Sequence, residues 1–334
     1  MKAIVVERFG KPSELRAVER RRPQPAAGEV LVRLEYAGVN FIDVYMRNGT
    51  YRRSNTYQTP LPLTPGMEGA GVVAEVGDGV SGFRRDDRVA YCLVSGSYAE
   101  YVAVPAWKLV HVPPAVAPPV AAALMLQGST AHYLTHSLYA LKHGDRALVH
   151  AAAGGVGQLL VQLAKRRGAT VIATVGSEEK AAIARARGAD HVILYRAEDV
   201  GAAVREFTAG AGVDVVYDSV GHDTIGCSIR CLRPRGTCVL FGASSGVVTA
   251  IDPLELAEAG SIFFTRPHLA DYLADAGEIA WRTADLFSAI ENGALHVSVD
   301  RLFSLNDAAL AHTALEAGTS RGKFLLEIAS ETAT

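Results

Sequence analysis

The run His150-Ala151-Ala152-Ala153-Gly154-Gly155-Val156-Gly157 joins a predicted strand over residues 146–150 to a predicted helix over residues 156–167. It matches the pattern G-x-G-x-x-G, with Ala152 in place of the first glycine. Small residues here permit a tight turn, close approach of a pyrophosphate to Gly154, and close packing of the helix at Gly157. The free N–H groups at the start of a helix bind phosphate. The sequence therefore predicts a dinucleotide-binding turn, and a tight turn without a ligand is the alternative.

Strands and helices alternate around this run. Predicted strands cover residues 146–150, 170–175, 191–195, 213–219, 237–241 and 262–265, and predicted helices cover 156–167, 178–187 and 197–207. Apolar strands separated by helices of about ten residues indicate βαβ units and a parallel sheet. Right-handed crossovers then give an α/β, doubly wound Rossmann domain with a six-stranded parallel sheet.

The chain before this region is rich in short strands. Residues 3–6, 29–36, 69–76 and 88–94 read as strands, and Gly- and Asp-containing turns separate them, which is typical of a small β-barrel. From about residue 267 the sequence is helical to 290 and strand-like at 302–303 and 324–328. This last part is too short for a domain of its own, so we expect it to fold back. The predicted domains are therefore 1–125 with 267–334, and 126–266.

Composition narrows the classes of function. The chain of 334 residues has 33 Lys+Arg against 35 Asp+Glu, which gives no electrostatic basis for binding nucleic acid or an anionic membrane. No apolar run reaches the ~18–20 residues of a membrane helix, and the first apolar run is too short for a signal peptide. The four cysteines form no CxxC pair, although Cys227 and Cys231 would share a helix face. We expect a cytoplasmic protein.

The end of the second strand favours NADP over NAD. NAD enzymes usually carry an acid there to hold the ribose 2′-hydroxyl, and this chain has Gly176. Ser177 can donate a hydrogen bond to a 2′-phosphate, Lys180 can reach it as a point charge, and Tyr195 can lie near the adenine. The alternatives are an ordinary helix cap at Ser177 and a solvated Lys180. The acids at 178–179 argue against the phosphate, although they also suit the helix dipole.

Several stretches together resemble the zeta-crystallin-type NADPH:quinone oxidoreductases, in the zinc-free branch of the medium-chain dehydrogenase/reductase superfamily. They are residues 38–45 (GVNFIDVY), 150–157, 174–177 (TVGS), 215–221 (VVYDSVG), 241–246 (FGASSG) and 265–267 (TRP). The resemblance implies a GroES-like catalytic domain beside the Rossmann domain and an active site in the cleft between them. It also implies a homodimer joined through Rossmann edge strands, here near residues 261–265.

The resemblance further implies a set of NADPH contacts at matching positions. These are Phe41, Thr130, Ala152, Gly154, Gly155, Val156, Gly157, Thr174, Gly176, Ser177, Lys180, Tyr195, Ser219, Phe241, Gly242, Ala243, Ser244, Phe264, Thr265, Arg266, Arg321 and Lys323.

Zinc is not expected. Alcohol dehydrogenases of this superfamily bind catalytic zinc through a Cys and a His, and the matching positions here are Asn40 and Met67. Asn is not a normal zinc ligand, and a thioether is too soft. Without this Lewis acid the substrate must accept hydride readily, as a quinone or a conjugated carbonyl compound does.

The candidate catalytic groups are Asn40, Asp43, Tyr45 and Tyr51. Asn40 can donate to a developing enolate oxygen, and Tyr45 or Tyr51 can do likewise or deliver a proton through water. The alternatives are a cap or a partner of a backbone N–H for Asp43, and half-buried packing for each tyrosine. The pair His132 and His136, one helical turn apart, is either a metal pair or a pair at the surface or beside the cofactor.

Three functions remain open from the sequence. The first is reduction of quinones by hydride or electron transfer from NADPH. The second is NADPH-dependent reduction of activated C=C bonds in an enone, enal or substituted acrylate. The third is a non-enzymatic NADPH-binding protein, crystallin-like or RNA-binding, although the balanced charge argues against RNA.

Overall fold

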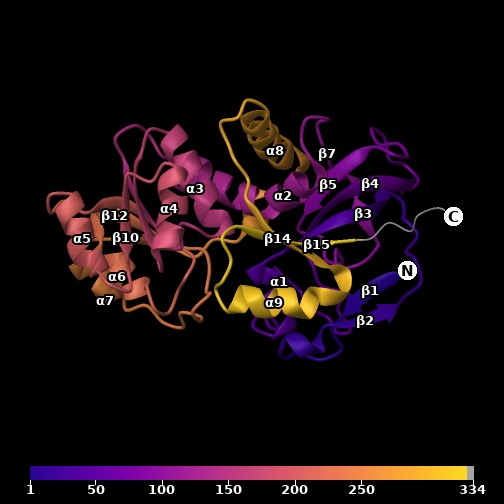
Figure 1. The fold of residues 1–334 in the computed structure, drawn as a ribbon, viewed down its shortest axis with the longest axis horizontal. Coiled ribbons are helices and arrows are strands. Elements are labelled where there is room, and N and C mark those ends of the chain that lie inside the picture. The colour runs from indigo at the N-terminus through magenta and orange to yellow at the C-terminus, as the bar shows by residue number, and fades with distance from the viewer. Residues whose placement is uncertain (329–334) are drawn as a thin grey trace. The chain divides into compact units, whose positions relative to one another are not determined.

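A computed structural model describes residues 1–328 of the chain (Figure 1), and these residues divide into two compact units. Unit 1 comprises Met1–Ser129 with the chain from Leu273 onward, and unit 2 comprises Thr130–Tyr272. The predicted domain boundaries lie at 125/126 and 266/267. Within the described residues, no helix has the length and apolar character that a membrane crossing requires.

Unit 2 contains a sheet of six parallel strands, as the sequence predicts. In chain order they are β8 (Arg146–Val149), β9 (Thr170–Val175), β10 (His191–Leu194), β11 (Val213–Asp218), β12 (Leu232–Leu240) and β13 (Phe263–Thr265). Their spatial order is β10-β9-β8-β11-β12-β13, and every neighbouring pair is parallel. This is the doubly wound order: β9 and β10 follow β8 on one side, and β11, β12 and β13 follow on its other side, so the strand order reverses between β8 and β11.

Helices connect these strands. They are α3 (Gly155–Arg166), α4 (Glu178–Ala186), α5 (Val200–Phe207), α6 (Ile225–Arg230) and α7 (Pro253–Glu258). Because the chain steps one way from β8 to β10 and the other way from β11 to β13, right-handed crossovers place α3 and α4 on one face and α5 to α7 on the other. The packing agrees, since α3 contacts α4 and α5 contacts α6.

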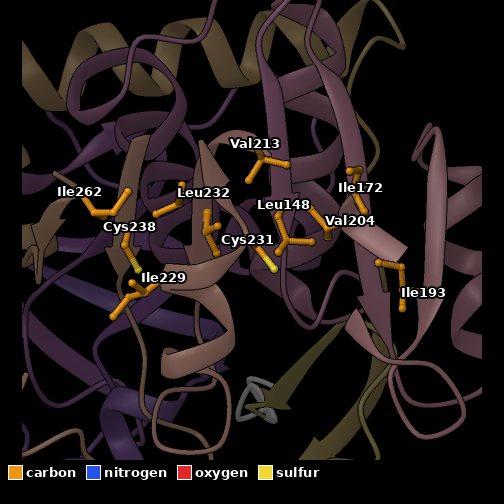
Figure 2. Packing of buried hydrophobic residues seen from close by; sticks show 11 residues of the cluster. Leu148, Ile172, Ile193, Val204, Val213, Ile229, Cys231, Leu232, Cys238 and Ile262 are labelled. Carbon is orange, nitrogen blue, oxygen red and sulfur yellow. The ribbon is translucent and has the colours of Figure 1, made fainter. Parts of the chain in front are cut away.

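The core of unit 2 is aliphatic (Figure 2). Leu148, Ile172 and Val216 come from the strands, and Val204 and Ile229 come from the helices, each at most 1% exposed. The strand residues are mostly β-branched, which suits a sheet that is covered on both faces.

Unit 1 is built on antiparallel strands. They are β1 (Lys2–Val5), β2 (Arg16–Glu19), β3 (Glu29–Val39), β4 (Glu68–Val76), β5 (Arg88–Cys92), β6 (Tyr101–Pro105), β7 (Val110–His111), β14 (Val299–Ser304) and β15 (Lys323–Glu327). The larger sheet has the order β14-β15-β3-β4-β5-β7, β6 also pairs with β3, and only β14 and β15 run parallel. The C-terminal segment thus returns to the N-terminal sheet, because β15 pairs with β3.

The helices of the remaining chain are α1 (Phe41–Arg47), α2 (Pro118–Tyr133), α8 (Ala276–Glu291) and α9 (Ala308–Glu316). Short 3-10 turns cover Pro12–Glu14, Ala106–Lys108, Leu269–Tyr272 and Leu305–Asp307, and a π-helical turn at Leu134–Leu138 follows α2.

The structure corrects several predicted boundaries. The helix predicted over residues 197–207 begins only at Val200, because the Asp199 carboxylate accepts the N–H of Ala202 and caps it. The helical region predicted over 267–290 divides into the 3-10 turn at Leu269–Tyr272 and α8, which Asp275 caps. Strand β12 begins at Leu232 rather than at residue 237, and α9 was not predicted.

Candidate active site and cofactor-binding edge

The carboxyl ends of the unit 2 strands bring most of the predicted cofactor contacts to one edge of the sheet. The glycine turn follows β8, Gly176 and Ser177 follow β9, Tyr195 follows β10, Ser219 follows β11, Phe241 to Ser244 follow β12, and Arg266 follows Phe264 and Thr265 of β13. Ligands of doubly wound folds bind outside the carboxyl ends of the strands at the point where strand order reverses, here between β8 and β11.

The glycine turn after β8 has the geometry of a phosphate cradle. The Gly154 N–H donates to the Ala151 carbonyl over 2.9 Å, and the Ala152 N–H donates to the Thr174 carbonyl over 3.2 Å. A Cβ on Gly157 would lie 2.3 Å from the Ala151 carbonyl oxygen, so this position requires glycine for α3 to pack against the turn. A Cβ on Gly154 would meet only the Ala151 oxygen, at 3.2 Å. Gly154 and the first N–H groups of α3 therefore fit a bound pyrophosphate.

A series of buried hydrogen bonds between side chains fixes the residues around this turn. Ser228 on α6 donates to Asp218 Oδ2 over 2.7 Å, so its oxygen is left to accept from His150 Nε2, 3.1 Å away. His150 Nδ1 then accepts from the Thr174 hydroxyl over 2.9 Å. Burial lowers the pKa of His150, which keeps the imidazole neutral. The Thr174 side chain is itself buried and committed to His150.

Asp218 anchors the next loop of the same edge. Its Oδ1 accepts the N–H groups of Val220 and Gly221 over 2.8 and 3.0 Å, directly after β11. Together with Ser228 and His150, this carboxylate fixes the ends of β8, β9 and β11 relative to one another.

Gly176 leaves room for an aromatic neighbour. A Cβ on Gly176 would lie 2.7 Å from the Tyr195 hydroxyl, so the absence of an acid at this position also has a packing cause. Tyr195 is 50% exposed. Ser177 caps α4, because its hydroxyl oxygen accepts the Lys180 N–H over 3.3 Å. The cap role that the sequence left open for Ser177 is therefore present, and its O–H remains available as a donor.

Unit 1 contains a buried charged cluster around Asn40. Asn40 Nδ2 donates to Glu68 Oε1 over 2.7 Å, and Lys323 Nζ donates to Asn40 Oδ1 over 2.6 Å. Lys323 also forms an ion pair with Glu68, and both side chains are at most 1% exposed. A primary amide has two N–H bonds, and these contacts use one of them. The cluster therefore holds the Asn40 amide in a single orientation, and these contacts leave its second N–H bond unused.

Glu68 is packed tightly at the start of β4. Its Oε2 accepts the Leu126 N–H of α2 over 2.6 Å. A Cβ on Gly38 would lie 2.0 Å from Glu68 Oε1, so Gly38 on the neighbouring strand β3 gives the carboxylate its space. The charge of Glu68 is thus balanced by one ammonium group and two N–H donors.

Asp43 lies in the interior of unit 1. Its Oδ2 accepts the Asn40 N–H over 2.8 Å and the Tyr98 hydroxyl over 3.3 Å, while Oδ1 has no partner among the described residues. Burial raises the pKa of Asp43 to about 7. This contact with the Asn40 N–H is the capping-box contact at the start of α1, so the two structural roles considered for Asp43, a cap and a partner of a backbone N–H, are both present. Asp43 is therefore a positioning residue for Asn40.

The chain of contacts continues to the surface. Tyr98 Oη lies 2.9 Å from His312 Nε2, and Arg47 lies 3.3 Å from His312 Nδ1. Because Arg47 can only donate, His312 carries its hydrogen on Nε2 and donates to Tyr98. Burial and Arg47 lower the pKa of His312 to about 3. Arg47 is paired with Glu316, which is partly exposed.

The two candidate tyrosines belong to a row of aromatic rings. Ring centroids are 6.0 Å apart for Phe41 and Tyr45, 5.3 Å for Tyr45 and Tyr51, and 5.4 Å for Tyr51 and Tyr57. Tyr45 is nearly buried and Tyr51 is partly exposed. The structure thus brings Tyr45 and Tyr51 together.

The remaining predicted contacts lie elsewhere in the chain. Thr130 is buried in α2, and Arg321 is exposed in the turn before β15, where its N–H donates to Asp300 over 2.8 Å. The rings of His132, near the end of α2, and His136, in the π-helical turn that follows, stack with centroids 4.0 Å apart, and His132 is fully buried.

Comparison with known proteins finds two family models and near full-length relatives. The models describe an alcohol dehydrogenase GroES-like domain, over residues 26–114, and a zinc-binding dehydrogenase, over residues 155–273. A quinone oxidoreductase of Pseudomonas aeruginosa is 42% identical, covering 97% of this chain and 99% of its own. A 2-haloacrylate reductase of a Burkholderia species is 42% identical over 97% of this chain and 98% of its own. The structure of Escherichia coli quinone oxidoreductase complexed with NADPH matches with a TM-score of 0.94 and 40% identity, covering 98% of this chain and 100% of that one.

The chain belongs to the quinone oxidoreductase family of medium-chain dehydrogenases/reductases. The family resemblance read from the sequence is thereby confirmed. The predicted fold class, a GroES-like domain with a six-stranded Rossmann domain, is confirmed as well.

The name of one matching model raises the question of zinc in this member of the quinone oxidoreductase family. A catalytic zinc takes Cys, His or carboxylate ligands. Around Asn40 the carboxylates are Glu68 and Asp43. Glu68 already binds the ammonium of Lys323, whose charge repels a metal cation. Asp43 accepts the Asn40 N–H and the Tyr98 hydroxyl, and burial raises its pKa to about 7, which disfavours its anionic form. These residues do not fit zinc, and its predicted absence stays a prediction.

Sequence reasoning missed the supporting groups of both sites. In unit 1 these are Arg47, Glu68, Tyr98, His312 and Glu316, and in unit 2 they are His150, Asp218 and Ser228. Glu68 carried a signal, since a lone acid in the apolar run Gly66-Met67-Glu68-Gly69-Ala70 must find a buried partner. His312 carried none, because its helix was not predicted.

Proposed function

We propose that this protein is an NADPH-dependent oxidoreductase that reduces quinones. The observation that carries the proposal is the cradle at the ends of β8 and β9, in a chain 42% identical to a quinone oxidoreductase over nearly its full length. The cradle supplies helix N–H groups for a pyrophosphate, and Gly176 and Ser177 leave a place without a carboxylate for a 2′-phosphate. Bound NADPH supplies the hydride.

The proposed reaction needs no metal. A quinone spreads the incoming charge onto its far oxygen, so hydrogen-bond donors suffice to stabilise it. We assign the available N–H of Asn40 to the developing oxyanion, held in place by Glu68, Lys323 and Asp43. Tyr45 and Tyr51 supply ring faces and hydroxyl groups for a flat substrate.

Reduction of activated C=C bonds is the second candidate function. The observation in its favour is the equal identity, 42%, to a 2-haloacrylate reductase. The same donor set serves an enolate oxygen as well as a semiquinone or hydroquinone oxygen.

The proposal extends to assembly and location. Strand β13 lies at the sheet edge and carries Phe263, which is 64% exposed, so it supports a homodimer joined through these strands.

All four cysteines are free thiols, which suits the reducing cytoplasm.

Steady-state oxidation of NADPH, followed by absorbance, tests the function. We expect turnover with simple benzoquinones and naphthoquinones, and slower or no turnover with NADH. Turnover of an enone or a haloacrylate with none of any quinone would make the second function the correct one. Binding of NADPH without oxidation by either panel would refute both and favour a non-enzymatic binding protein. We also expect metal analysis of the active protein to find less than one zinc ion per chain.

A further inference from the structure

Two thiols lie side by side on α6. Cys227 is in the helix and Cys231 is its C-terminal cap residue, and their sulfurs are 3.8 Å apart. Cys227 is partly exposed, whereas Cys231 is 2% exposed and belongs to the aliphatic core, where Figure 2 labels it. One thiol is therefore open to a small reagent from solvent, and the second stands directly behind it.

The surroundings divide the reactivity between the two thiols. The hydrogen bond with Cys231 and the charge of Arg230 lower the pKa of Cys227 to about 7, against the opposing effects of burial, Asp199 and Asp218. The same hydrogen bond and burial raise the pKa of Cys231, although Arg205 opposes them. At neutral pH the exposed thiol is partly a thiolate, which is the nucleophilic form, and the buried one is its proton donor.

We propose that Cys227 and Cys231 are a redox-sensitive pair that a hydroperoxide oxidises to a disulfide within α6. The Cys227 thiolate attacks the peroxide O–O bond, forming a sulfenic acid and releasing the alcohol or water after protonation. The Cys231 thiol then displaces hydroxide from the sulfenic sulfur, which forms the S–S bond and, with the thiol proton, water. The peroxide takes up the two electrons that the two thiols lose.

The bridge distorts the end of the helix. Residues four apart in a helix have Cα atoms about 6 Å apart, within the range of disulfides, but their Cβ atoms lie about 5–6 Å apart where a disulfide has roughly 4 Å. Cys231 is the last residue of the helical turn, so this turn can tighten without disrupting a following one. A bond formed under such strain is readily reduced again by a cellular dithiol.

The same turn of α6 carries Ser228. Its hydroxyl joins Asp218 to His150, at the ends of β11 and β8. Movement of the turn therefore weakens a contact that fixes the cofactor-binding edge. This consequence rests on the proposed function, and we expect the bridge to weaken NADPH binding about fivefold, the equivalent of one hydrogen bond.

Thiol counting on the full-length chain tests the pair without reference to activity. The chain is treated with one equivalent of hydrogen peroxide at neutral pH and then denatured, its remaining thiols are alkylated, and peptides are mapped by mass. Two of the four thiols should be lost, as a Cys227–Cys231 bridge in a monomeric chain that dithiothreitol reverses. Cys92 and Cys238, whose pKa burial raises, are internal controls and should be fully alkylated.

Two variants separate the steps. Cys231→Ala should stop at a sulfenic acid on Cys227 that dimedone labels, and Cys227→Ser should lose no thiol; matching far-ultraviolet circular dichroism spectra establish that both fold. Four intact thiols in the wild type, a bridge to Cys238, or a bridge between two chains would each overturn the proposal. If the disulfide within α6 forms completely and the affinity for NADPH does not change, the proposed effect of the disulfide on the cofactor-binding edge is wrong. If the reduced chain does not bind NADPH at all, the proposed function is refuted, but the proposal of a redox-sensitive thiol pair is not.

Discussion

The buried pair of Lys323 and Glu68 yields the sharpest prediction. Replacing Lys323 by Met removes the ammonium that binds Glu68 and donates to Asn40, and leaves the carboxylate with two N–H donors at 0% exposure. Removing one partner of a buried pair costs about 3–5 kcal/mol, because an uncompensated charge stays in the interior. The two remaining donors place the expected loss near the lower end, about 3 kcal/mol. For a chain of 334 residues, an unfolding entropy of about 2.1 cal/mol/K per residue makes this a fall in melting temperature of roughly 4 °C.

Two further variants decide whether charge is the cause. Adding Glu68→Gln to Lys323→Met removes the orphaned charge and keeps the acceptor for Leu126, so most of the lost stability should return. Lys165→Met breaks the pair with Asp190, whose side chains are both 35% exposed, and should cost less than about 1 kcal/mol. A loss in Lys323→Met no larger than in Lys165→Met, or a double variant as unstable as the single one, would refute the reasoning.

Three further predictions concern pH and cofactor choice. Since the pKa of Asp43 is raised from 3.8 to about 7 and that of His312 is lowered from 6.5 to about 3, their effects on unfolding free energy cancel between about pH 4.5 and 6.5. In urea titrations over this pH range, the unfolding free energy of Asp43→Asn should rise with pH, by up to about 1.4 kcal/mol per pH unit, because only His312 then contributes. That of His312→Gln should fall with pH, because only Asp43 then contributes. Equal slopes of unfolding free energy against pH in the two variants would contradict this. Gly176→Asp should shift the Kd ratio towards NADH more than Gly176→Ala does, since only the acid repels a 2′-phosphate while both crowd Tyr195. Lys180→Ala should weaken NADPH but not NADH binding, about tenfold for one charged hydrogen bond, and an unchanged ratio would contradict that assignment.

The sequence predicts unit 2 well because its signals are local. Each strand is a short apolar run, each connection carries a helix, and the handedness of crossovers leaves only a few doubly wound topologies. The strand over residues 170–175 matches β9 residue for residue. The helix at 197–207 was predicted three residues too long at its start because Asp199, a strong cap, lies inside the predicted segment.

The candidate site was predictable only where a residue follows a strand end. Gly154, Gly176 and Tyr195 each stand at such a place, so the topology brings them together. The Tyr195 hydroxyl against Gly176 was not predictable, because a contact between two loops depends on side-chain packing. The absence of an acid at Gly176 therefore has two causes, cofactor charge and packing, and the sequence suggested only the first.

The charged cluster of unit 1 shows why its C-terminal segment returns to the N-terminal sheet. Asn40 and Lys323 are 283 positions apart, yet β15 pairs with β3 and places the ammonium against the amide. His312 and Glu316, both on α9, likewise complete the contacts of Tyr98 and Arg47. The first 129 residues alone would bury Glu68 without its cation and Arg47 without its carboxylate. Because an isolated buried charge costs several kcal/mol, these residues should not fold stably by themselves, and the N-terminal site exists only once the last strand has paired.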